Sequence, residues 1–188
     1  MARVTIGMRT SLDGFVADAS GDSSPLYPDL EGIAENAVVR EAIERTGAVI
    51  LGRNSYDMAD EDLTGYEFQV PIFVLTHHPP NRGPKGENED LTVTFVSEGI
   101  ERAVELAKAA AGDLDVTIIG ADVCRQALRA GLVDDVQVGI VPVLFGRGKR
   151  LFEDGGTDRI ELERVRVIET DVDTDIRFRV RGGQRGPL

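Results

Sequence analysis

Residues 115–131 carry the pattern that most restricts the fold: a short apolar run, one glycine and then helical spacing. The run at 116–119 is β-branched and typical of a buried strand. Gly120 ends it, Asp122 can cap a helix, and apolar residues then recur at helical spacing. Such a turn can bind an anion, because a residue without Cβ lets a ligand approach the first helical N–H groups. An ordinary strand–turn–helix connection has the same pattern, and these residues alone do not separate the two.

A second unit of this kind lies earlier in the chain. A buried-strand pattern at 48–51 leads into the stretch 52–56, GRNSY. Arg53 follows the glycine and Ser55 lies near the helix start, so a guanidinium, a hydroxyl and backbone N–H groups can hold a phosphate together. A helix cap beside a surface arginine is the equally simple alternative. Helices between these strands predict a mostly parallel sheet.

Hydrophobic periodicity predicts the remaining elements. Further strands are expected at 4–8, 72–76, 91–96, 136–143, 160–170 and 175–181, and amphipathic helices at about 30–45 and 100–111. Gly47 and Gly112 are expected to end these helices, Pro142 to bend its strand or keep it at an edge, and residues 18–28 to form a surface loop. The fold class is therefore α/β in three layers: a mostly parallel central sheet, helices on both faces and an antiparallel C-terminal hairpin. We expect one domain over 1–181 and a flexible tail at 182–188.

Charge and cysteine content exclude several classes of function. The 188 residues carry a formal net charge of −12, which argues against nucleic acid or an anionic membrane as a main partner. Cys124 is the single cysteine, which excludes an intrachain disulfide and a multi-cysteine metal site. His77 and His78 lack partners at metal-ligand spacing, so no metal is expected. With neither a signal-peptide core nor an apolar stretch of membrane-spanning length, a cytoplasmic protein is expected.

Four stretches in order resemble a known family: SLDG at 11–14, GRNSY at 52–56, IGAD at 119–122 with QAL at 126–128, and AGLVD at 130–134 through PVLFG at 142–146. The chain resembles the dihydrofolate-reductase-like fold from Val4 to Val180, in the branch of the C-terminal reductase domain of the bacterial bifunctional riboflavin biosynthesis protein. No part of these residues resembles the deaminase half of that protein. The chain is therefore not expected to carry out both of its steps.

The resemblance implies an NADPH site along the carboxyl ends of the strands. Residues beside the nicotinamide would be Ser11, Gly14, Val16 and Ala17. Residues on the phosphates would be Gly52, Arg53, Asn54 and Ser55, with Arg53 toward the 2′-phosphate. Residues at the adenosine would be Leu75, Thr76 and His77. Residues at the pyrophosphate would be Gly120, Ala121, Asp122 and Val123.

The implied activity is hydride transfer from NADPH to a C=O or C=N carbon of a small heterocyclic or phosphorylated substrate. It is similar to the 5-amino-6-(5-phosphoribosylamino)uracil reductase step of riboflavin biosynthesis. Asp13 is the one acid at the nicotinamide end, either as a catalytic proton donor or as a turn cap. Candidate substrate-binding residues are Phe145, Arg147 and Arg150, together with Lys149. A solvated basic turn is the alternative for these cations.

Departures from the family pattern keep other functions open. Ala121 stands where relatives usually have a second glycine, and Gln137 and Gly139 lie in a strand that often carries a histidine. The acidic pterin-binding residue of dihydrofolate reductase has no clear counterpart, which argues against folate reduction. A non-catalytic nucleotide-binding module is a further alternative. Relatives often pair through their C-terminal strands, so a homodimer is expected.

Overall fold

The computed structural model of the chain describes residues 2–28, 30–81, 83–153 and 159–181. Its strands are β1 (Val4–Ser11), β2 (Phe15–Asp18), β3 (Thr46–Gly52), β4 (Ile72–Leu75), β5 (Val93–Val96), β6 (Asp115–Ile119), β7 (Asp135–Val141), β8 (Gly148–Arg150), β9 (Leu162–Glu169) and β10 (Thr174–Val180). Its α-helices are α1 (Ala37–Arg45), α2 (Arg53–Met58), α3 (Ile100–Ala111) and α4 (Ala121–Arg129). Two short 3₁₀ helices, η1 (Ser24–Leu26) and η2 (Leu30–Glu35), precede α1. The tail expected at 182–188 lies outside the described residues.

Eight of the described strands form one sheet in the order β5-β4-β3-β6-β1-β7-β10-β9. Neighbours from β5 to β7 pair in parallel. The β9–β10 hairpin adds two antiparallel pairings at one edge. The mostly parallel sheet and the C-terminal hairpin expected from the sequence are therefore confirmed.

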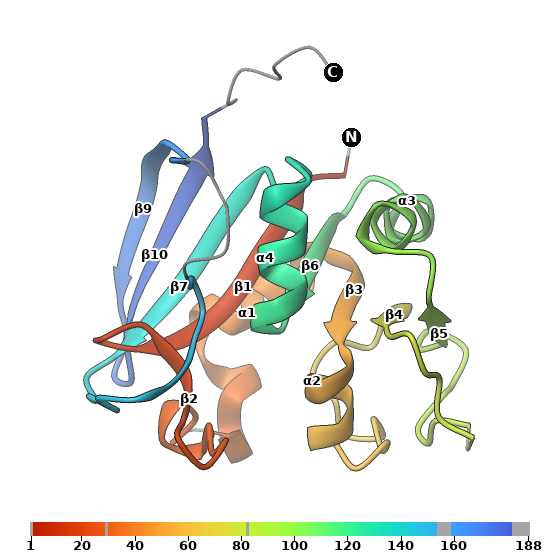
Figure 1. Cartoon of the computed structure of the whole chain (residues 1–188), viewed down its shortest axis with the longest axis horizontal. Coiled ribbons are helices and arrows are strands. Elements are labelled where there is room, and N and C mark those ends of the chain that lie inside the picture. The colour runs from red at the N-terminus through yellow and green to blue at the C-terminus, as the bar shows by residue number, and fades with distance from the viewer. Residues whose placement is uncertain (1, 29, 82, 154–158, 182–188) are drawn as a thin grey trace.

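Helices cover both faces of this sheet. In Figure 1, α4 crosses in front of the strands while α1 lies behind them. Ile50 of β3 packs in a core with the apolar faces of α3 and α4. Its neighbours Val49 and Leu51 belong to a second core with α1 and α2. Every residue of β3 is buried, which explains why its sequence is apolar without alternation.

The prediction of a single helix over residues 30–45 is wrong. Residues Leu30–Glu35 form a 3₁₀ helix that is interrupted at Gly32, and the α-helix begins only at Ala37. Asn36 separates the two, because its side chain accepts a hydrogen bond of 2.9 Å from the backbone N–H of Val38. An asparagine in this position caps a new helix instead of continuing the old one.

Two glycine predictions have different outcomes. Gly112 ends α3 with a φ of +61°, as expected. Gly47 does not end α1, since it lies inside β3. A Cβ on Gly47 would lie 2.6 Å from the carbonyl oxygen of Ala111, so its small size serves the close packing of β3 against the end of α3.

The segment after β7 also differs from expectation. Pro142 follows the end of β7, and β7 itself is an interior strand between β1 and β10, so the expected edge position is wrong. The basic stretch that follows is not only a loop, because it contains β8. That strand pairs antiparallel with β2 and places Lys149 opposite Ala17. A three-residue strand made of glycine and two cations carries too little periodicity to be recognised in isolation.

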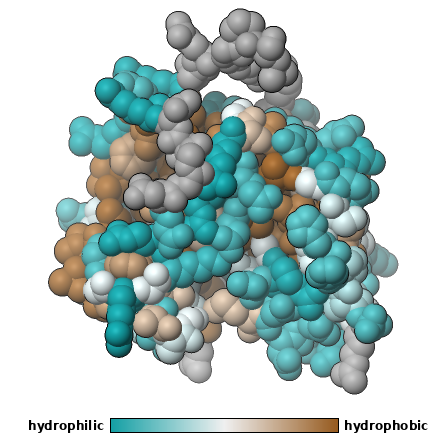
Figure 2. Space-filling model, in the orientation of Figure 1, coloured by the Kyte–Doolittle hydropathy of each residue, from teal (hydrophilic) through white to brown (hydrophobic). Residues whose placement is uncertain are grey.

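The C-terminal hairpin leaves apolar side chains at the surface. Val165 and Val167 of β9 are 47% and 46% exposed. Figure 2 shows apolar residues gathered on the left of the molecule, where Figure 1 places β9 and β10. An apolar hairpin face of this kind is a candidate contact surface for another chain.

Candidate functional site

A cleft of about 320 Å³ opens where the parallel strands β3, β4, β5 and β6 end. Its lining comes from these strand ends, from the starts of α2 and α4, and from β8. The lining residues are Gly52, Arg53, Asn54, Ser55, Leu75, Thr76, His77, His78, Val96, Ser97, Gly99, Gly120, Ala121, Asp122, Val123, Gln126 and Lys149. Ligands of open α/β sheets bind at this end of the strands.

Two glycine corners meet inside the cleft. β3 and β6 are parallel neighbours in which Leu51 pairs with Ile119, so the turns that follow them lie side by side. Gly120 has a φ of +116°, and a Cβ on it would lie 3.0 Å from the Ser55 hydroxyl oxygen and 3.3 Å from the Gly52 nitrogen. Only glycine leaves space between these corners. Both turns that the sequence indicates as possible anion sites therefore share one cleft.

The start of α4 accommodates alanine in place of a second glycine. Ala121 is the first residue of the helix and its side chain is buried in the core with Val123 and Cys124. A residue in helical conformation needs no freedom at positive φ. The turn itself is carried by Gly120, whose N–H contacts the Met8 sulfur at 3.2 Å. Asp122, expected as the helix cap, lies in the first turn instead, and the capping position belongs to Gly120.

Arg53 forms one rim of the cleft. Its Nε donates to the Asp57 carboxylate at 2.6 Å, and its Nη1 donates to the His78 carbonyl at 2.6 Å. The second bond joins α2 to the segment that follows β4. Thr76 orders this segment, since its hydroxyl exchanges hydrogen bonds of 3.2 Å with the backbone of His78. The guanidinium is thereby held at the mouth of the cleft, where part of it is exposed.

Lys149 of β8 also lines the cleft. Its Nζ donates to the Asp122 carboxylate at 2.5 Å, and Arg125 donates to the same carboxylate. Arg125 also donates to the Arg150 carbonyl at 2.9 Å, so β8 is attached to α4 at two points. Burial acts to raise the pKa of Asp122, but Lys149 and Arg125 outweigh it and hold that pKa below its ordinary value. Asp122 is consequently an anion at the start of α4.

Apart from Lys149, the residues predicted for the nicotinamide and the substrate are not among those that line this cleft. Most of them surround the turn between β1 and β2. Arg150 donates to the Asp13 carbonyl at 3.0 Å, and its guanidinium stacks 4.3 Å from the ring centre of Phe15. Phe145 reaches the same turn through its N–H, and Arg147 is exposed. Ser11, Gly14, Val16 and Ala17 belong to β1, β2 and this turn. β8 contributes to both places: its Lys149 lines the cleft, and its Arg150 bonds to the turn between β1 and β2.

Asp13 ties the β1–β2 turn to the loop after β7. Its carboxylate accepts hydrogen bonds from the Ser11 hydroxyl at 2.6 Å, the Gly146 N–H at 2.7 Å and the Phe145 N–H at 3.2 Å. These bonds, with the Ser11 hydroxyl first, lower the pKa of Asp13. The geometry favours the turn-capping interpretation over the proton-donor one.

Several lining residues are absent from the sequence-based prediction. Val96, Ser97 and Gly99 follow the end of β5, and His78 follows the predicted His77. The rule that ligands lie at the carboxyl ends of parallel strands applies to β5 as it does to β4, and would have found them. Gln126, one turn into α4, had no such signal. Lys149 was expected at the substrate and instead lines the cleft.

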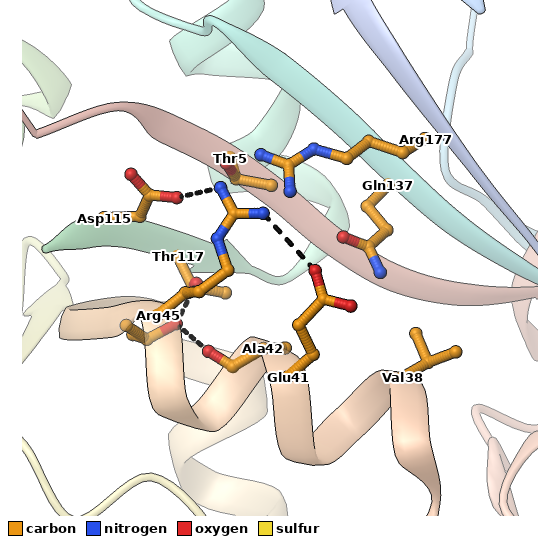
Figure 3. Close-up of a pocket in the computed structure, with 10 residues that line it drawn as sticks. Thr5, Val38, Glu41, Ala42, Arg45, Asp115, Thr117, Gln137 and Arg177 are labelled. Atoms are coloured by element: carbon orange, nitrogen blue, oxygen red, sulfur yellow. Dashed lines mark hydrogen bonds and ion pairs between the residues drawn. The ribbon is translucent and has the colours of Figure 1, made fainter. Parts of the chain in front are cut away.

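A second, smaller pocket of about 20 Å³ lies at the amino ends of the strands, between α1 and the sheet. Figure 3 shows Arg45 reaching from α1 between Glu41 and Asp115. Its guanidinium lies 3.5 Å from the Glu41 carboxylate and 2.7 Å from that of Asp115. Thr5 is buried here, and its hydroxyl has no hydrogen-bond partner among the described residues. Arg45 is paired with two carboxylates and Arg177 with Asp135, so neither of the arginines that line this pocket is free for a ligand.

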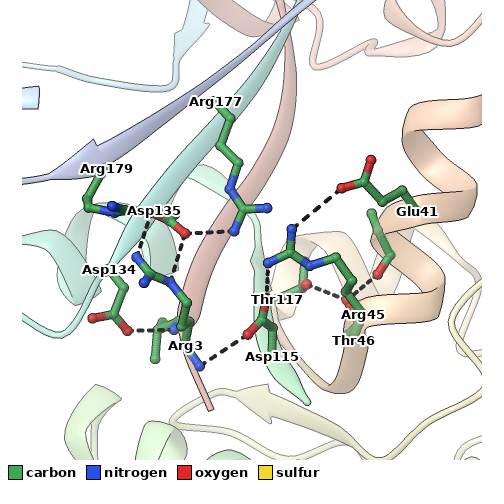
Figure 4. Close-up of polar contacts among 12 residues, drawn as sticks. Arg3, Glu41, Arg45, Thr46, Asp115, Thr117, Asp134, Asp135, Arg177 and Arg179 are labelled. Carbon is green, nitrogen blue, oxygen red and sulfur yellow. Dashed lines mark hydrogen bonds and ion pairs between the residues drawn. The ribbon is translucent and has the colours of Figure 1, made fainter. Parts of the chain in front are cut away.

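An ion-pair network continues from this pocket along the amino ends, as Figure 4 shows. Asp135 is buried at the start of β7 and accepts hydrogen bonds from Arg3 at 2.8 Å and from Arg177 at 2.6 Å. Burial acts to raise the pKa of Asp135, but the two arginines outweigh it and lower that pKa. The network joins the first strand to the C-terminal hairpin, and it lies at the opposite end of the sheet from the cleft.

Within the described ranges, the structure has neither a membrane-spanning helix nor a metal-binding cluster. No helix within them has the length and apolar character needed to cross a membrane. The same ranges contain no group of three or more His, Cys, Asp or Glu side chains arranged to hold a metal ion.

Comparisons with known proteins agree with this architecture. The RibD C-terminal domain family matches residues 2–174. The uncharacterized protein YwjB of Bacillus subtilis (strain 168) is 24% identical over 153 residues, which are 81% of this chain and 83% of that protein.

Solved structures share the fold. A putative riboflavin biosynthesis protein from Shewanella sp. PV-4 has a TM-score of 0.75 and 22% identity, covering 96% of this chain and 99% of that one. The Thermotoga maritima diaminohydroxyphosphoribosylaminopyrimidine deaminase/5-amino-6-(5-phosphoribosylamino)uracil reductase has a TM-score of 0.71 and 18% identity over 95% of this chain and 56% of that one. Dihydrofolate reductase from Enterococcus faecalis, complexed with NADP(H), has a TM-score of 0.60 and 15% identity over 95% and 96%. The resemblance inferred from the four sequence stretches is confirmed.

Proposed function

This chain belongs to the RibD C-terminal domain family, and we propose on that premise that it is an NADPH-dependent reductase of a small heterocyclic, phosphorylated substrate. The proposed reaction is hydride transfer to a C=O or C=N carbon, similar to the 5-amino-6-(5-phosphoribosylamino)uracil reductase step of riboflavin biosynthesis. Members of the family act as reductases in that pathway, which supports an oxidoreductase.

One observation carries the proposal: the two glycine corners, which the resemblance assigns to cofactor phosphates, open into a single cleft. A Cβ on Gly120 would occupy the space between Ser55 and Gly52, so the residues present fit a ligand that approaches the backbone closely. Arg53 and Lys149 both line the cleft and supply positive charge to it. A dinucleotide carries anionic phosphates that such groups bind.

We assign each part of the cleft a role in holding NADPH. The corners at Gly52 and Gly120 would face the phosphates, and the segment at Thr76 and His77 would face the adenosine. When bound, NADPH would supply the hydride. The protein contributes alignment of donor and acceptor, which depends on rigid support. The hydrogen bonds of Asp13 provide that support by fixing the turn where the nicotinamide would lie.

The proposed substrate side is the surface around Phe145, Arg147 and Arg150. An aromatic ring and two cations suit a heterocycle that carries a phosphate. Arg150 already stacks on Phe15 and donates to the turn at Asp13, so its guanidinium is positioned before any ligand arrives. Proton delivery is assigned to water, because the geometry gives Asp13 a structural role.

A direct assay tests the proposal. The purified protein is mixed with NADPH and 5-amino-6-(5-phosphoribosylamino)uracil, and loss of NADPH absorbance is followed. We expect substrate-dependent oxidation, and we expect Arg53→Ala to weaken NADPH binding about tenfold, the loss typical of one charge-assisted hydrogen bond. Arg102→Ala, on the exposed surface of α3, is the matched control and should leave binding unchanged.

The alternatives give different results in the same assay. Binding of NADPH without oxidation of any carbonyl, pterin or pyrimidinone substrate would favour a nucleotide-binding module. Oxidation with dihydrofolate alone would favour a dihydrofolate reductase. Absence of NADPH binding would contradict the proposed cofactor and the module together.

A further inference from the structure

The cations of the cleft are not free in this structure. Arg53 is bonded to Asp57, and Lys149 is bonded to Asp122. Both carboxylates lie at the surface, with side chains 45% and 55% exposed. Each of these two cations of the cleft is therefore paired with a carboxylate that is accessible to water.

Asp122 poses an electrostatic difficulty for any anion bound at the start of α4. Its carboxylate lies in the first helical turn, beside the N–H groups that follow Gly120. An unpaired carboxylate here would repel a phosphate, since like charges at close range disfavour each other. The chain as a whole also carries a formal net charge of −12, so an anionic ligand depends on local cations.

Lys149 and Arg125 both neutralise the Asp122 carboxylate, but they differ in how firmly they are held. Arg125 is 14% exposed and is held by its bond to the Arg150 carbonyl and by an ion pair of 3.7 Å with Glu153, so we expect it to stay on Asp122 when a ligand binds. Lys149 is more exposed, at 35%, and its flexible side chain lines the cleft. Asp122 can lose Lys149 and stay neutralised by Arg125, so the release of Lys149 leaves no unpaired carboxylate.

We propose that Lys149 exchanges Asp122 for a phosphate of the bound dinucleotide and is a pyrophosphate-binding residue. This inference rests on the proposed function, because it assumes NADPH in the cleft. Lys149 is bonded to Asp122 in the first turn of α4, whereas Arg53 is the first residue of α2. This contact with the start of α4 assigns Lys149 to the pyrophosphate and leaves the 2′-phosphate to Arg53.

Comparing NADPH with NADH tests whether Lys149 contacts the pyrophosphate or the 2′-phosphate. NADH has the pyrophosphate but no 2′-phosphate. Isothermal titration calorimetry of Lys149→Met should show NADPH and NADH weakened by the same factor, about tenfold, as expected when one charge-assisted hydrogen bond is lost. Lys149→Arg should retain most of the affinity. Lys108→Met, on the exposed surface of α3, makes the same charge change away from the cleft and should alter neither affinity.

A second variant tests the exchange itself. Asp122→Asn frees Lys149 in advance, so NADPH should bind about fivefold tighter, which corresponds to removal of one exposed ion pair. Asp113→Asn, an exposed acid outside the cleft, is the control for net charge and should not change the affinity. Thermal melts of all variants establish that they are folded.

The outcomes separate this inference from the proposed function. If the wild-type protein binds NADPH and Lys149→Met leaves the affinity unchanged, or weakens NADPH alone, the role of Lys149 is overturned while the proposed cofactor stands. Weaker or unchanged binding by Asp122→Asn overturns the exchange. A wild-type protein that binds neither cofactor overturns the proposed function itself.

Discussion

Asp13 shows how the same residue type can serve catalysis or structure. Three hydrogen bonds fix its carboxylate between two loops and lower its pKa. A carboxyl group whose pKa is lowered is already deprotonated near neutral pH, so it has no proton to donate there.

We predict that Asp13→Asn retains the pH profile of kcat and loses less than about 10²-fold in kcat, the smallest effect typical of a general acid. The amide has one oxygen, so it can keep one of the two backbone hydrogen bonds that the two carboxylate oxygens of Asp13 accept from the loop. Asp13→Ala removes both and should lower the melting temperature further. Steady-state kinetics across pH checks this. If the wild-type kcat falls as pH rises and Asp13→Asn abolishes that fall, the proton-donor hypothesis is restored.

Asp135 holds together the ion-pair network at the amino ends of the strands. Its folded pKa lies below the ordinary value of 3.8, because Arg177 and Arg3 favour the charged form. Stability from such a group is fully present above the unfolded pKa and is lost as pH falls through the folded pKa.

We predict that Asp135→Asn lowers the free energy of unfolding by about 3 kcal/mol at neutral pH, as for a buried pair that loses one partner. The difference from wild type should shrink as pH falls below about 4. Urea unfolding at a series of pH values measures it. The exposed Asp113→Asn is the control, and a difference that stays constant down to low pH would contradict the assignment.

At the scale of elements, the β6–Gly120–α4 unit combines a turn at positive φ with the start of a helix. Gly120 needs its positive φ and also the space that a Cβ would take from Ser55. Ala121, one residue later, is helical and buried. Exchanging glycine and alanine should therefore cost more at Gly120 than at Ala121.

We predict that Gly120→Ala costs about 1–3 kcal/mol of stability through backbone strain and weakens NADPH binding by closing the space between the corners. Ala121→Gly should cost about 1 kcal/mol or less and preserve binding. Thermal melts and calorimetric titration of this matched pair check both effects. Equal losses in the two variants would show that the turn imposes no special requirement at Gly120.

At the scale of the whole molecule, the hairpin β9–β10 leaves an apolar surface beside an edge strand. Exposed strands with apolar side chains favour association with another chain. We propose that the protein is a homodimer that buries this surface. The exposure of Val165 and Val167 supports the proposal.

We predict that the wild-type protein sediments as a dimer and that Val167→Asp sediments as a monomer, because a carboxylate in an apolar interface would be buried without a partner. Analytical ultracentrifugation measures this. Leu114→Asp changes an exposed apolar residue outside the hairpin and should leave the dimer intact. A monomeric wild-type protein would rule out the proposed assembly.

Local patterns in the sequence determined most of the framework of this molecule. Strand runs, glycine turns and helical spacing depend on residues close in the chain, so the parallel sheet, the C-terminal hairpin and the two corners at Gly52 and Gly120 were predictable. The prediction of one helix over 30–45 was wrong because Gly32 and Asn36 interrupt the helix, although the apolar spacing continues across them. Periodicity does not register such interruptions.

Only the tertiary structure decided which groups meet. Lys149 bonds to Asp122 across 27 positions and Arg177 bonds to Asp135 across 42, distances in sequence over which no local pattern carries information. The assignment of Lys149 to the cleft depends on the pairing of β8 with β2, and a short polar strand has no signal until its partner is in place. The sequence by itself determined that two glycine turns lead from strands into helices, and the register between β3 and β6 decided that they open into one cleft.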